Sequence, residues 1–473
     1  MSRDRLVPLI VAVALFMENM DATIIATSLP AIAADIGANP LALKLAITSY
    51  LLSLAVFIPA SGWTADRFGA RTVFSAAIAT FVVGSIGCAL AHSLEGFVIA
   101  RIVQGMGAAM MTPVGRLVLV RSIDKHRLVD AMAWVTMPAL VGPIIGPPVG
   151  GFITTYASWH WIFLINVPIG LIGIALALRT IEDVRVEGLE RFDIVGVALA
   201  GAGVAGLAFG LSVAGLGLLP ATVVAGLVAG GAIFMGAYVV HARQIPAPVL
   251  DFSLVRLPTL RATVIGGSLF RLGIGSLSFL LPMMLQLGFG YSPLESGLVT
   301  FTAALGAFTM KSVAAAIIRR FGFRRVLIVN GLISSAFTAA CAGFTPATPF
   351  AVMVAVLLVG GFFRSLQFTA TNTIAYADVE PRRMSRATAL VSVAQQLSIA
   401  AGVAVGALAV ELSVQSRADG TITAADFHPA FLVVGAIAGS SALLFWSLPP
   451  DAGASLANRA PVAASDASDQ RVG

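Results

Sequence analysis

Charged residues and cysteines are both scarce in this sequence of 473 residues. Asp, Glu, Lys and Arg together occupy 11% of the positions, whereas soluble domains carry about a quarter. Hydrophobic residues make up 58%, which indicates an all-α integral membrane protein. The two cysteines, Cys88 and Cys341, fall in apolar runs, so the sequence offers neither a disulfide framework nor a metal-binding cluster.

Patterns for catalysis and nucleotide binding are also missing. The five histidines fall near the ends of apolar runs, and no Ser/His/Asp arrangement is present. The run from Gly142 to Gly151 contains no lysine, so it is not a phosphate-binding loop. We therefore predict that the protein is not an enzyme and uses no cofactor and no metal. The net charge of +6 does not predict a nucleic-acid partner, because in a membrane chain the positions of the charges matter more than their sum.

Apolar runs of about 20 residues, the length that crosses a bilayer as a helix, recur along the whole chain. They are bounded by charged or turn-forming residues, and fourteen can be counted. The predicted spans are Leu6–Leu29, Leu43–Trp63, Val73–Ala91, Leu94–Val114, Val129–Tyr156, Trp161–Leu178, Ile194–Val213, Leu218–His241, Leu260–Leu287, Leu294–Ile318, Val326–Phe344, Phe350–Ala377, Ala387–Leu412 and Phe427–Leu448.

The basic residues fall mostly on one side of these spans. Of the 29 Lys and Arg residues, only Lys44 and Arg417 fall in loops on the other side, and four lie within spans. The positive-inside rule then places the basic side, with both termini, in the cytoplasm. The first run resembles a signal peptide, but its length and its acidic residues predict an uncleaved span. Arg outnumbers Lys 26 to 3, a ratio typical of G+C-rich bacteria, so we expect a multi-pass protein of a bacterial inner membrane.

An internal repeat divides the chain into two halves. Asp66–Phe74, between the second and third spans, is similar to Arg319–Leu327, between the tenth and eleventh. Repeated halves that meet at a midplane site are typical of secondary transporters. The predicted parts are an N-terminal six-helix bundle (1–181), a linker with an inserted helix pair (182–258), a C-terminal six-helix bundle (259–449) and a disordered cytoplasmic tail (450–473).

Two acidic residues, Glu18 and Asp21, lie inside the first span. A carboxylate at the bilayer centre costs at least about 2.5 kcal/mol, so it normally faces a polar interior, a partner or a water-filled path. The pair therefore indicates a proton or ligand site. The alternative, that both acids pack or cap without a transport role, stays open.

Arg101 lies within the fourth span, at about the same depth from the outer surface as Asp21. A buried arginine stays charged at any relevant pH, so it can hold a nearby carboxylate ionised and be released when that carboxylate takes a proton. We expect Arg101 to pair with Asp21. Snorkelling of Arg101 to the outer headgroups is the alternative.

The second half places three cations, Arg271, Lys311 and Arg364, within spans. If all three face inward, they favour an anionic substrate. Alternatively, Lys311 snorkels to the cytoplasmic surface and Arg364 binds backbone carbonyls. We predict a substrate-binding set made of these three residues together with Gln104 and Trp134, although aromatic residues in spans more often serve packing.

Three short motifs resemble those of the major facilitator superfamily. One resembles the loop motif that latches the inner face in that family, another resembles its proton-coupling motif, and the last resembles the motif of its antiporters. The loop motif consists of Gly62, Asp66, Arg67, Gly69 and Arg71; the proton-coupling motif of Arg101, Gln104, Gly105 and Gly107; and the antiporter motif, expected to kink its helix, of Gly142, Pro143, Gly146, Pro147, Gly150 and Gly151.

The first span resembles a signature of one branch of this superfamily, the fourteen-spanner drug:proton antiporters, through Asp21, Thr23 and Leu29-Pro30. The resemblance implies a major facilitator fold with fourteen transmembrane helices arranged 6+2+6. It also implies a monomer that exports small amphipathic or drug-like compounds by alternating access, driven by the proton gradient. Two alternatives remain: an exporter of an organic anion, metabolite or metal chelate, and a membrane sensor or scaffold that transports nothing.

Overall fold

The computed structural model describes residues 3–123, 128–182, 193–213, 218–245, 248–380, 383–417, 421–454 and 456. Most of the predicted linker before the inserted pair and most of the predicted tail lie outside these residues. The side chains of residues 3–5, 128–134, 136–137 and 139–140 are also outside the description, and Trp134 is among them.

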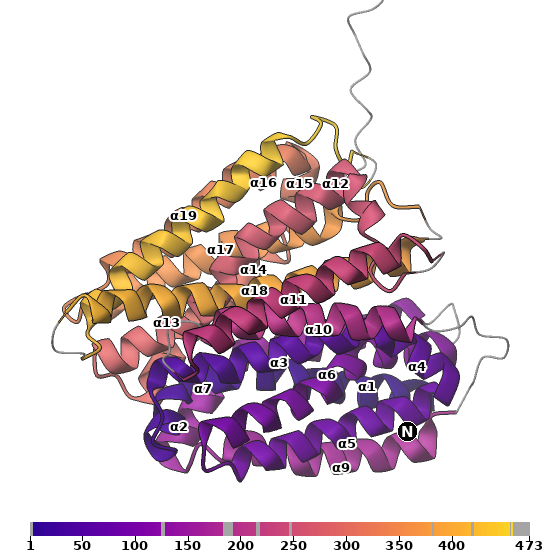
Figure 1. The fold of residues 1–473 in the computed structure, drawn as a ribbon, viewed down its shortest axis with the longest axis horizontal. Coiled ribbons are helices and arrows are strands. Elements are labelled where there is room, and N and C mark those ends of the chain that lie inside the picture. Colours follow the sequence, from indigo (N-terminus) through magenta and orange to yellow (C-terminus); the bar gives the residue numbers. More distant parts are fainter. Residues whose placement is uncertain are drawn as a thin grey trace, which may run out of the picture.

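The first half of the chain consists of helices joined by short turns and loops (Figure 1). Its helices are α1 (Arg3–Ile24), α2 (Leu29–Asp35), α3 (Lys44–Phe57), α4 (Ser61–Phe68), α5 (Ala70–Ala89), α6 (Leu94–Ser122), α7 (Leu128–Tyr156), α8 (Trp161–Leu164) and α9 (Asn166–Thr180). The short 3-10 turns η1 (Ile25–Thr27), η2 (Pro40–Leu43) and η3 (Ile58–Ala60) extend α1, α3 and α4.

Two helices, α10 (Ile194–Val213) and α11 (Ala221–Ala242), separate this half from the second. The second half contains η5 (Phe252–Arg256), α12 (Pro258–Arg261), η6 (Ala262–Gly266), α13 (Gly267–Met283), η7 (Met284–Gly288), α14 (Pro293–Met310), α15 (Ala314–Phe321), α16 (Phe323–Ala340), η8 (Cys341–Gly343), α17 (Phe350–Ile374), α18 (Met384–Gln415), η10 (Ala424–Asp426) and α19 (Phe427–Trp446).

The sequence repeat forms the same kind of turn in both halves. Gly69 joins α4 to α5 with φ of 93°, and Gly322 joins α15 to α16 with φ of 77°. Only glycine adopts this backbone region without steric cost. The glycine is therefore needed at the matching position of each copy, because a tight turn connects the two helices there.

The described residues contain 12 helices that are long and apolar enough to cross a membrane, or up to 13 if α14 and α15, which are bent by 60° at their junction, form one span. The fifth predicted span coincides with α7, a helix of 29 residues. The all-α membrane architecture is confirmed, whereas the count of fourteen spans remains a prediction.

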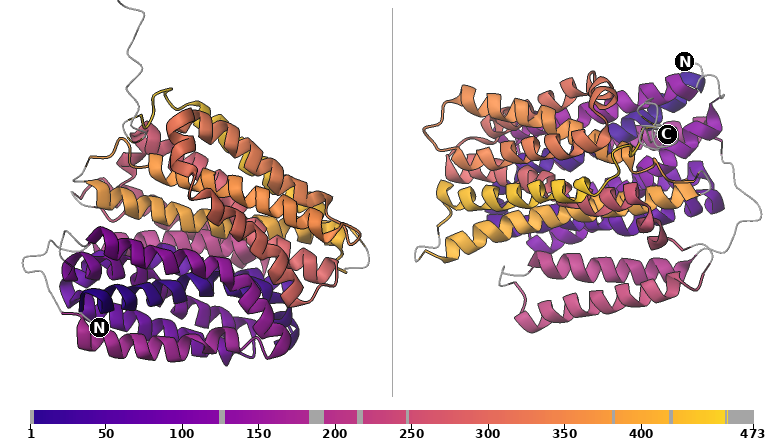
Figure 2. Two further views of the ribbon diagram at one scale, coloured as in Figure 1. Left: turned by 180° about the vertical axis from the view of Figure 1, so that it is seen from behind. Right: turned by 90° about the horizontal axis from the view of Figure 1, so that it is seen from above.

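The helices pack as two groups that follow the two halves of the chain. In the first group α1 packs on α7 and α5 on α6; in the second α13 packs on α18, α14 on α17 and α16 on α19. The groups meet where α7 packs against α14 and α3 against α18. They approach each other at one end and diverge toward the end that carries the N-terminus (Figure 2). The inserted α10 and α11 pack on each other beside α3.

Candidate functional site

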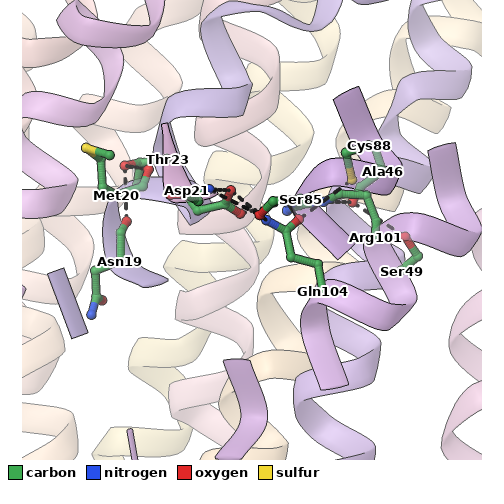
Figure 3. A network of polar contacts seen from close by, with 11 residues as sticks. Asn19, Met20, Asp21, Thr23, Ala46, Ser49, Ser85, Cys88, Arg101 and Gln104 are labelled. Carbon is green, nitrogen blue, oxygen red and sulfur yellow. Dashed lines mark hydrogen bonds and ion pairs between the residues drawn. The ribbon is translucent and has the colours of Figure 1, made fainter. Parts of the chain in front are cut away.

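The buried ion pair between Asp21 and Arg101 forms the centre of the site. Arg101 Nη1 donates to Asp21 Oδ2 over 2.7 Å, and the two side chains are 1% and 0% exposed. Asp21 comes from α1 and Arg101 from α6, so the structure brings together the two residues expected to pair (Figure 3). A buried pair is retained only when further hydrogen bonds satisfy the remaining donors and acceptors.

Two amides supply such bonds to the carboxylate of Asp21. Gln104 Nε2 donates to Asp21 Oδ1 over 2.8 Å, and Asn166 Nδ2 donates to the same oxygen over 3.1 Å. Both amides also donate to Ser85 Oγ, at 2.8 and 3.3 Å. With Arg101, three donors therefore converge on Asp21, an arrangement suited to the ionised carboxylate.

The guanidinium of Arg101 has partners of its own. Its Nε donates to the carbonyl of Ala46 over 3.1 Å, and its Nη1 also donates to Gln104 Oε1 over 2.5 Å. Its Cζ lies 4.2 Å from the centre of the Tyr50 ring, a cation–π contact. Tyr50 also lines the central cavity, so it links the network to the space where a substrate would lie.

Glu18 lies outside this network. It accepts a hydrogen bond of 2.8 Å from Thr112 Oγ1 and lines the cavity, whereas Asp21 does not line it. The two acids of the first span therefore differ in environment: Asp21 is enclosed by donors from its own half of the chain, and Glu18 faces the space between the halves.

The cavity has a volume of about 400 Å³ and lies between the two groups of helices. Its wall combines apolar side chains with a few polar ones, as is usual for small-molecule sites. From the first half the polar and charged lining includes Glu18, Asn19, Thr23 and Tyr50, and from the second half Thr300, Arg364, Gln395 and Gln396.

The predicted substrate-binding residues occupy different places. Arg364 lines the cavity, and Gln104 belongs to the Asp21 network. Arg271 is buried and donates to Asn372 Oδ1 over 2.7 Å. Lys311 is exposed at the end of α14 and donates to Thr369 Oγ1 over 2.9 Å. The described cavity lining includes neither Arg271 nor Lys311, because α13 and α14 direct these side chains elsewhere, and the Trp134 side chain lies outside the described residues.

The predicted gate motif forms a contact within the first half. Asp66 of α4 accepts a hydrogen bond of 2.5 Å from Arg121 at the end of α6. Gly62 and Arg67 are exposed, and Gly69 forms the turn described above. Arg71 is half-buried at the start of α5. The observed ion pair therefore joins α4 to α6 and does not cross to the second half.

The glycines of the predicted antiporter motif allow α7 to approach two helices closely. A Cβ added at Gly142 would lie 3.0 Å from the carbonyl oxygen of Phe16 in α1, and one added at Gly150 would lie 2.5 Å from that of Ile24. At Gly151 the added Cβ would lie 2.4 Å from the Pro293 carbonyl oxygen of the second half. The motif therefore packs α7 within its half and also against the other half.

Several contacts close one end of the cavity. Lys44 Nζ lies 3.2 Å from Glu411 Oε1, with side chains only 1% and 7% exposed. Gln286 Nε2 donates to the carbonyl of Thr27 over 2.9 Å. Each contact joins one half to the other, and we call the end that carries them the closed end. The sequence indicated Lys44 only as an isolated outer cation, and nothing singled out Glu411.

Breaking the Lys44–Glu411 pair on one side is expected to destabilise the protein. In Lys44→Gln the carboxylate of Glu411 stays buried without a cation, a loss that costs about 3–5 kcal/mol in buried pairs. We expect the unfolding midpoint to fall in thermal unfolding of the purified variant. The double variant Lys44→Met/Glu411→Leu should recover it, because no unpaired charge remains. Equal midpoints for wild type and Lys44→Gln would show that the pair contributes nothing.

A helical membrane protein whose two halves enclose a central cavity, with a buried Asp–Arg pair beside it, has the features of a secondary transporter. The chain belongs to the Major Facilitator Superfamily, whose profile matches residues 11–194 and 263–468. It is thus a multi-pass membrane transporter and not an enzyme, as the sequence predicted. The unmatched stretch between the two segments contains nearly all of α10 and all of α11.

Relatives in bacteria match most of this chain. It is 37% identical over 450 residues to the protein named "Putative multidrug resistance protein MdtD" of Salmonella heidelberg (strain SL476), covering 93% of this chain and 94% of that one. It is 38% identical over 449 residues to the protein of the same name from Klebsiella pneumoniae, covering 94% of each.

Solved structures share the fold at low sequence identity. The nucleoside transporter NupG matches with a TM-score of 0.66 at 14% identity, covering 94% of this chain and 98% of that one. The inward open conformation of the xylose transporter XylE from E. coli matches with a TM-score of 0.63 at 14% identity, covering 95% of this chain and 98% of that one.

Proposed function

We propose that this protein exports small amphipathic or drug-like compounds across the bacterial inner membrane in exchange for protons. The observation that carries the proposal is the Asp21–Arg101 ion pair, buried beside a cavity that both halves line. The name of the MdtD relatives supports the compound class. In this proposal the chain is a monomer with fourteen spans arranged 6+2+6 and both termini in the cytoplasm. The family profile leaves nearly all of α10 and all of α11 unmatched between its two segments, which favours the 6+2+6 arrangement with these helices as an inserted pair.

The chemistry of the network supports proton coupling. Ionised Asp21 accepts hydrogen bonds from Arg101, Gln104 and Asn166. A proton on Asp21 removes its charge and weakens the attraction to Arg101. Because these donors come from α6 and α9, protonation changes the balance of forces among the helices of the first half. Glu18, on the cavity wall, is a second candidate for the proton and for contact with a cationic substrate.

The difference between the two ends of the cavity supports alternating access. With the N-terminus in the cytoplasm, the closed end faces outward and the diverging end faces inward. The state described here would then receive substrate from the cytoplasm. Export requires the contacts at the closed end to separate, so the Lys44–Glu411 pair and the α7–α14 packing open in the outward-facing state. The Asp66–Arg121 pair stabilises the inner ends of α4 and α6 and is the candidate gate.

An organic anion is the second candidate for the substrate, because Arg364 is the one described cation on the cavity wall. Glu18 is the one described anion there. The two are contributed by opposite halves of the chain. A cationic substrate would pair with Glu18, and an anionic one with Arg364.

Replacement of Arg364 distinguishes these substrates. If the cargo is an anion, Arg364→Gln should raise its apparent KM by about 10- to 150-fold, the range expected for loss of a charged hydrogen bond. Transport of cations should remain within about twofold of wild type. The assay uses purified protein in liposomes with an imposed proton gradient and a panel of cationic, neutral and anionic compounds.

Lys311→Gln is the matched control for this experiment, because Lys311 is exposed and pairs with Thr369 away from the described cavity wall. Transport of every compound in the panel by Lys311→Gln should match that of wild type. If Arg364→Gln and Lys311→Gln weaken anion transport equally, Arg364 is not a substrate ligand. If no compound moves and no proton flux occurs, the transport proposal itself fails.

A further inference from the structure

A second pocket lies between the inserted helix pair and the second half, away from the transport cavity. It has a volume of about 570 Å³, and the two pockets share no described lining residue. It lies where α11 ends and η5 and α18 begin. Four arginines line it, and we call it the arginine pocket: Arg243, Arg256, Arg383 and Arg386, together with Asp251.

The charges of the arginine pocket do not cancel. Asp251 Oδ2 lies 2.7 Å from Arg383 and 3.9 Å from Arg386. Burial opposes ionisation of this carboxyl, but hydrogen bonds from Ser253 and Arg383 outweigh it and lower its pKa below the ordinary value. Asp251 is therefore ionised and offsets one arginine. Within the described part of the chain, the side chains of Arg243 and Arg256 make no hydrogen bond or ion pair.

Apart from Ser253, the rest of the wall is apolar. Val239, Ala242 and Ile245 come from the end of α11 and the turn after it, and Phe252, 37% exposed, comes from η5. Only 11% of the most apolar window of α11 is buried, so most of this helix faces outward. Figure 2 shows α10 and α11 lying beside the main bundle. The pocket therefore combines cations with an apolar surface at the level where membrane helices end.

The positive-inside rule accounts for arginines in these loops. It does not account for the convergence of four of them on one pocket with a single carboxylate. Arginine binds phosphate oxygens through paired N–H donors, and basic pockets between membrane helices on the cytoplasmic side bind anionic lipid headgroups. If the headgroup phosphate of a phospholipid lay between Arg243 and Arg256, the acyl chains of that lipid would lie against α11.

We propose that the arginine pocket binds the phosphate headgroup of an anionic phospholipid. Such a lipid would join the inserted helix pair to the second half, since Arg243 follows α11 whereas Arg383 and Arg386 belong to the start of α18. The proposal depends on the membrane location of the chain and not on its cargo. It can therefore hold or fail independently of proton-coupled export.

Native mass spectrometry of the full-length protein in detergent tests this site, with phosphatidylglycerol as the probe. Wild type should retain phosphatidylglycerol in preference to zwitterionic phosphatidylcholine. The double variant Arg243→Gln/Arg256→Gln should bind phosphatidylglycerol about 30-fold more weakly, the effect of losing two surface arginines. Both side chains are exposed, so their replacement leaves the helix packing intact.

The matched control, Arg179→Gln/Arg319→Gln, removes two exposed arginines from the same predicted side of the membrane. It should bind phosphatidylglycerol like wild type. Equal weakening in both double variants would overturn the proposal, because it would indicate a diffuse attraction to positive charge. Equal retention of phosphatidylcholine would also overturn it. Displacement of the lipid by millimolar inorganic phosphate would assign the pocket to free phosphate instead.

Discussion

Asp21→Asn is expected to abolish uphill transport. A gradient of two pH units is worth about 2.7 kcal/mol per proton, which allows about 100-fold concentration of a neutral substrate when one proton is exchanged. Asparagine cannot take up a proton, so the concentration ratio across the liposome membrane should fall to about one. The measurement is the steady-state accumulation of substrate in proteoliposomes with and without the gradient.

A folding defect must be separated from loss of coupling in this variant. Asp21→Asn leaves Arg101 buried without a counter-charge, which costs several kcal/mol. The variant Asp21→Asn/Arg101→Gln removes both charges and should fold with a higher unfolding midpoint than Asp21→Asn alone. Both variants should still exchange labelled for unlabelled substrate without a gradient, if they fold.

Glu18→Gln tests which acid carries the proton. Glu18 bonds to Thr112 and lines the cavity, so its replacement should change substrate preference and leave gradient-driven accumulation of neutral compounds in place. Loss of accumulation in Glu18→Gln, together with full accumulation in Asp21→Asn, would transfer the coupling role to Glu18.

Gly151→Val is expected to disfavour closure between the halves. A Cβ at this position would lie 2.4 Å from the Pro293 carbonyl oxygen and 2.8 Å from Leu294 Cα, both backbone atoms of the other half. Overpacking costs about 1–3 kcal/mol, which lowers the population of the closed state about 5- to 150-fold. The transport rate should fall accordingly, because each cycle passes through that state.

Accessibility of the cavity measures this closure. A cysteine at Ala22, in a background without Cys88 and Cys341, should react faster with a membrane-impermeant maleimide from the closed end in Gly151→Val. Gly236→Val is the control, because a Cβ at Gly236 in α11 meets nothing within 4 Å. Unchanged labelling and transport in Gly151→Val would show that the α7–α14 contact does not close the cavity.

The sequence predicted the fold more fully than the site. Apolar runs of membrane-spanning length and the repeated turn at Gly69 and Gly322 are local signals, so they define the helices and the two halves. The Asp21–Arg101 pair also had a local signal, since charges inside spans are rare. Their equal depth suggested a pair that the structure brings together at 2.7 Å.

The remaining parts of the site depend on how each helix is rotated and which helices meet. Asn166 and Glu411 lie in predicted spans, and nothing in the sequence around them predicted their partners. Lys44 and Glu411 are 367 positions apart, so their contact arises only when the halves pack. The sequence grouped Arg271, Lys311 and Arg364 together because all three are cations within predicted spans. Helix rotation and packing, which the sequence does not reveal, place only Arg364 on the described cavity wall.

Substrate-triggered proton flux tests the proposed exchange most directly. Purified protein is placed in liposomes that contain a pH-sensitive dye, a proton gradient is imposed, and transported compounds are added to wild type and to Asp21→Asn. We expect addition of substrate to accelerate proton movement in wild type, with no acceleration in Asp21→Asn. Substrate transport by wild type without any accompanying proton movement would contradict proton-coupled export.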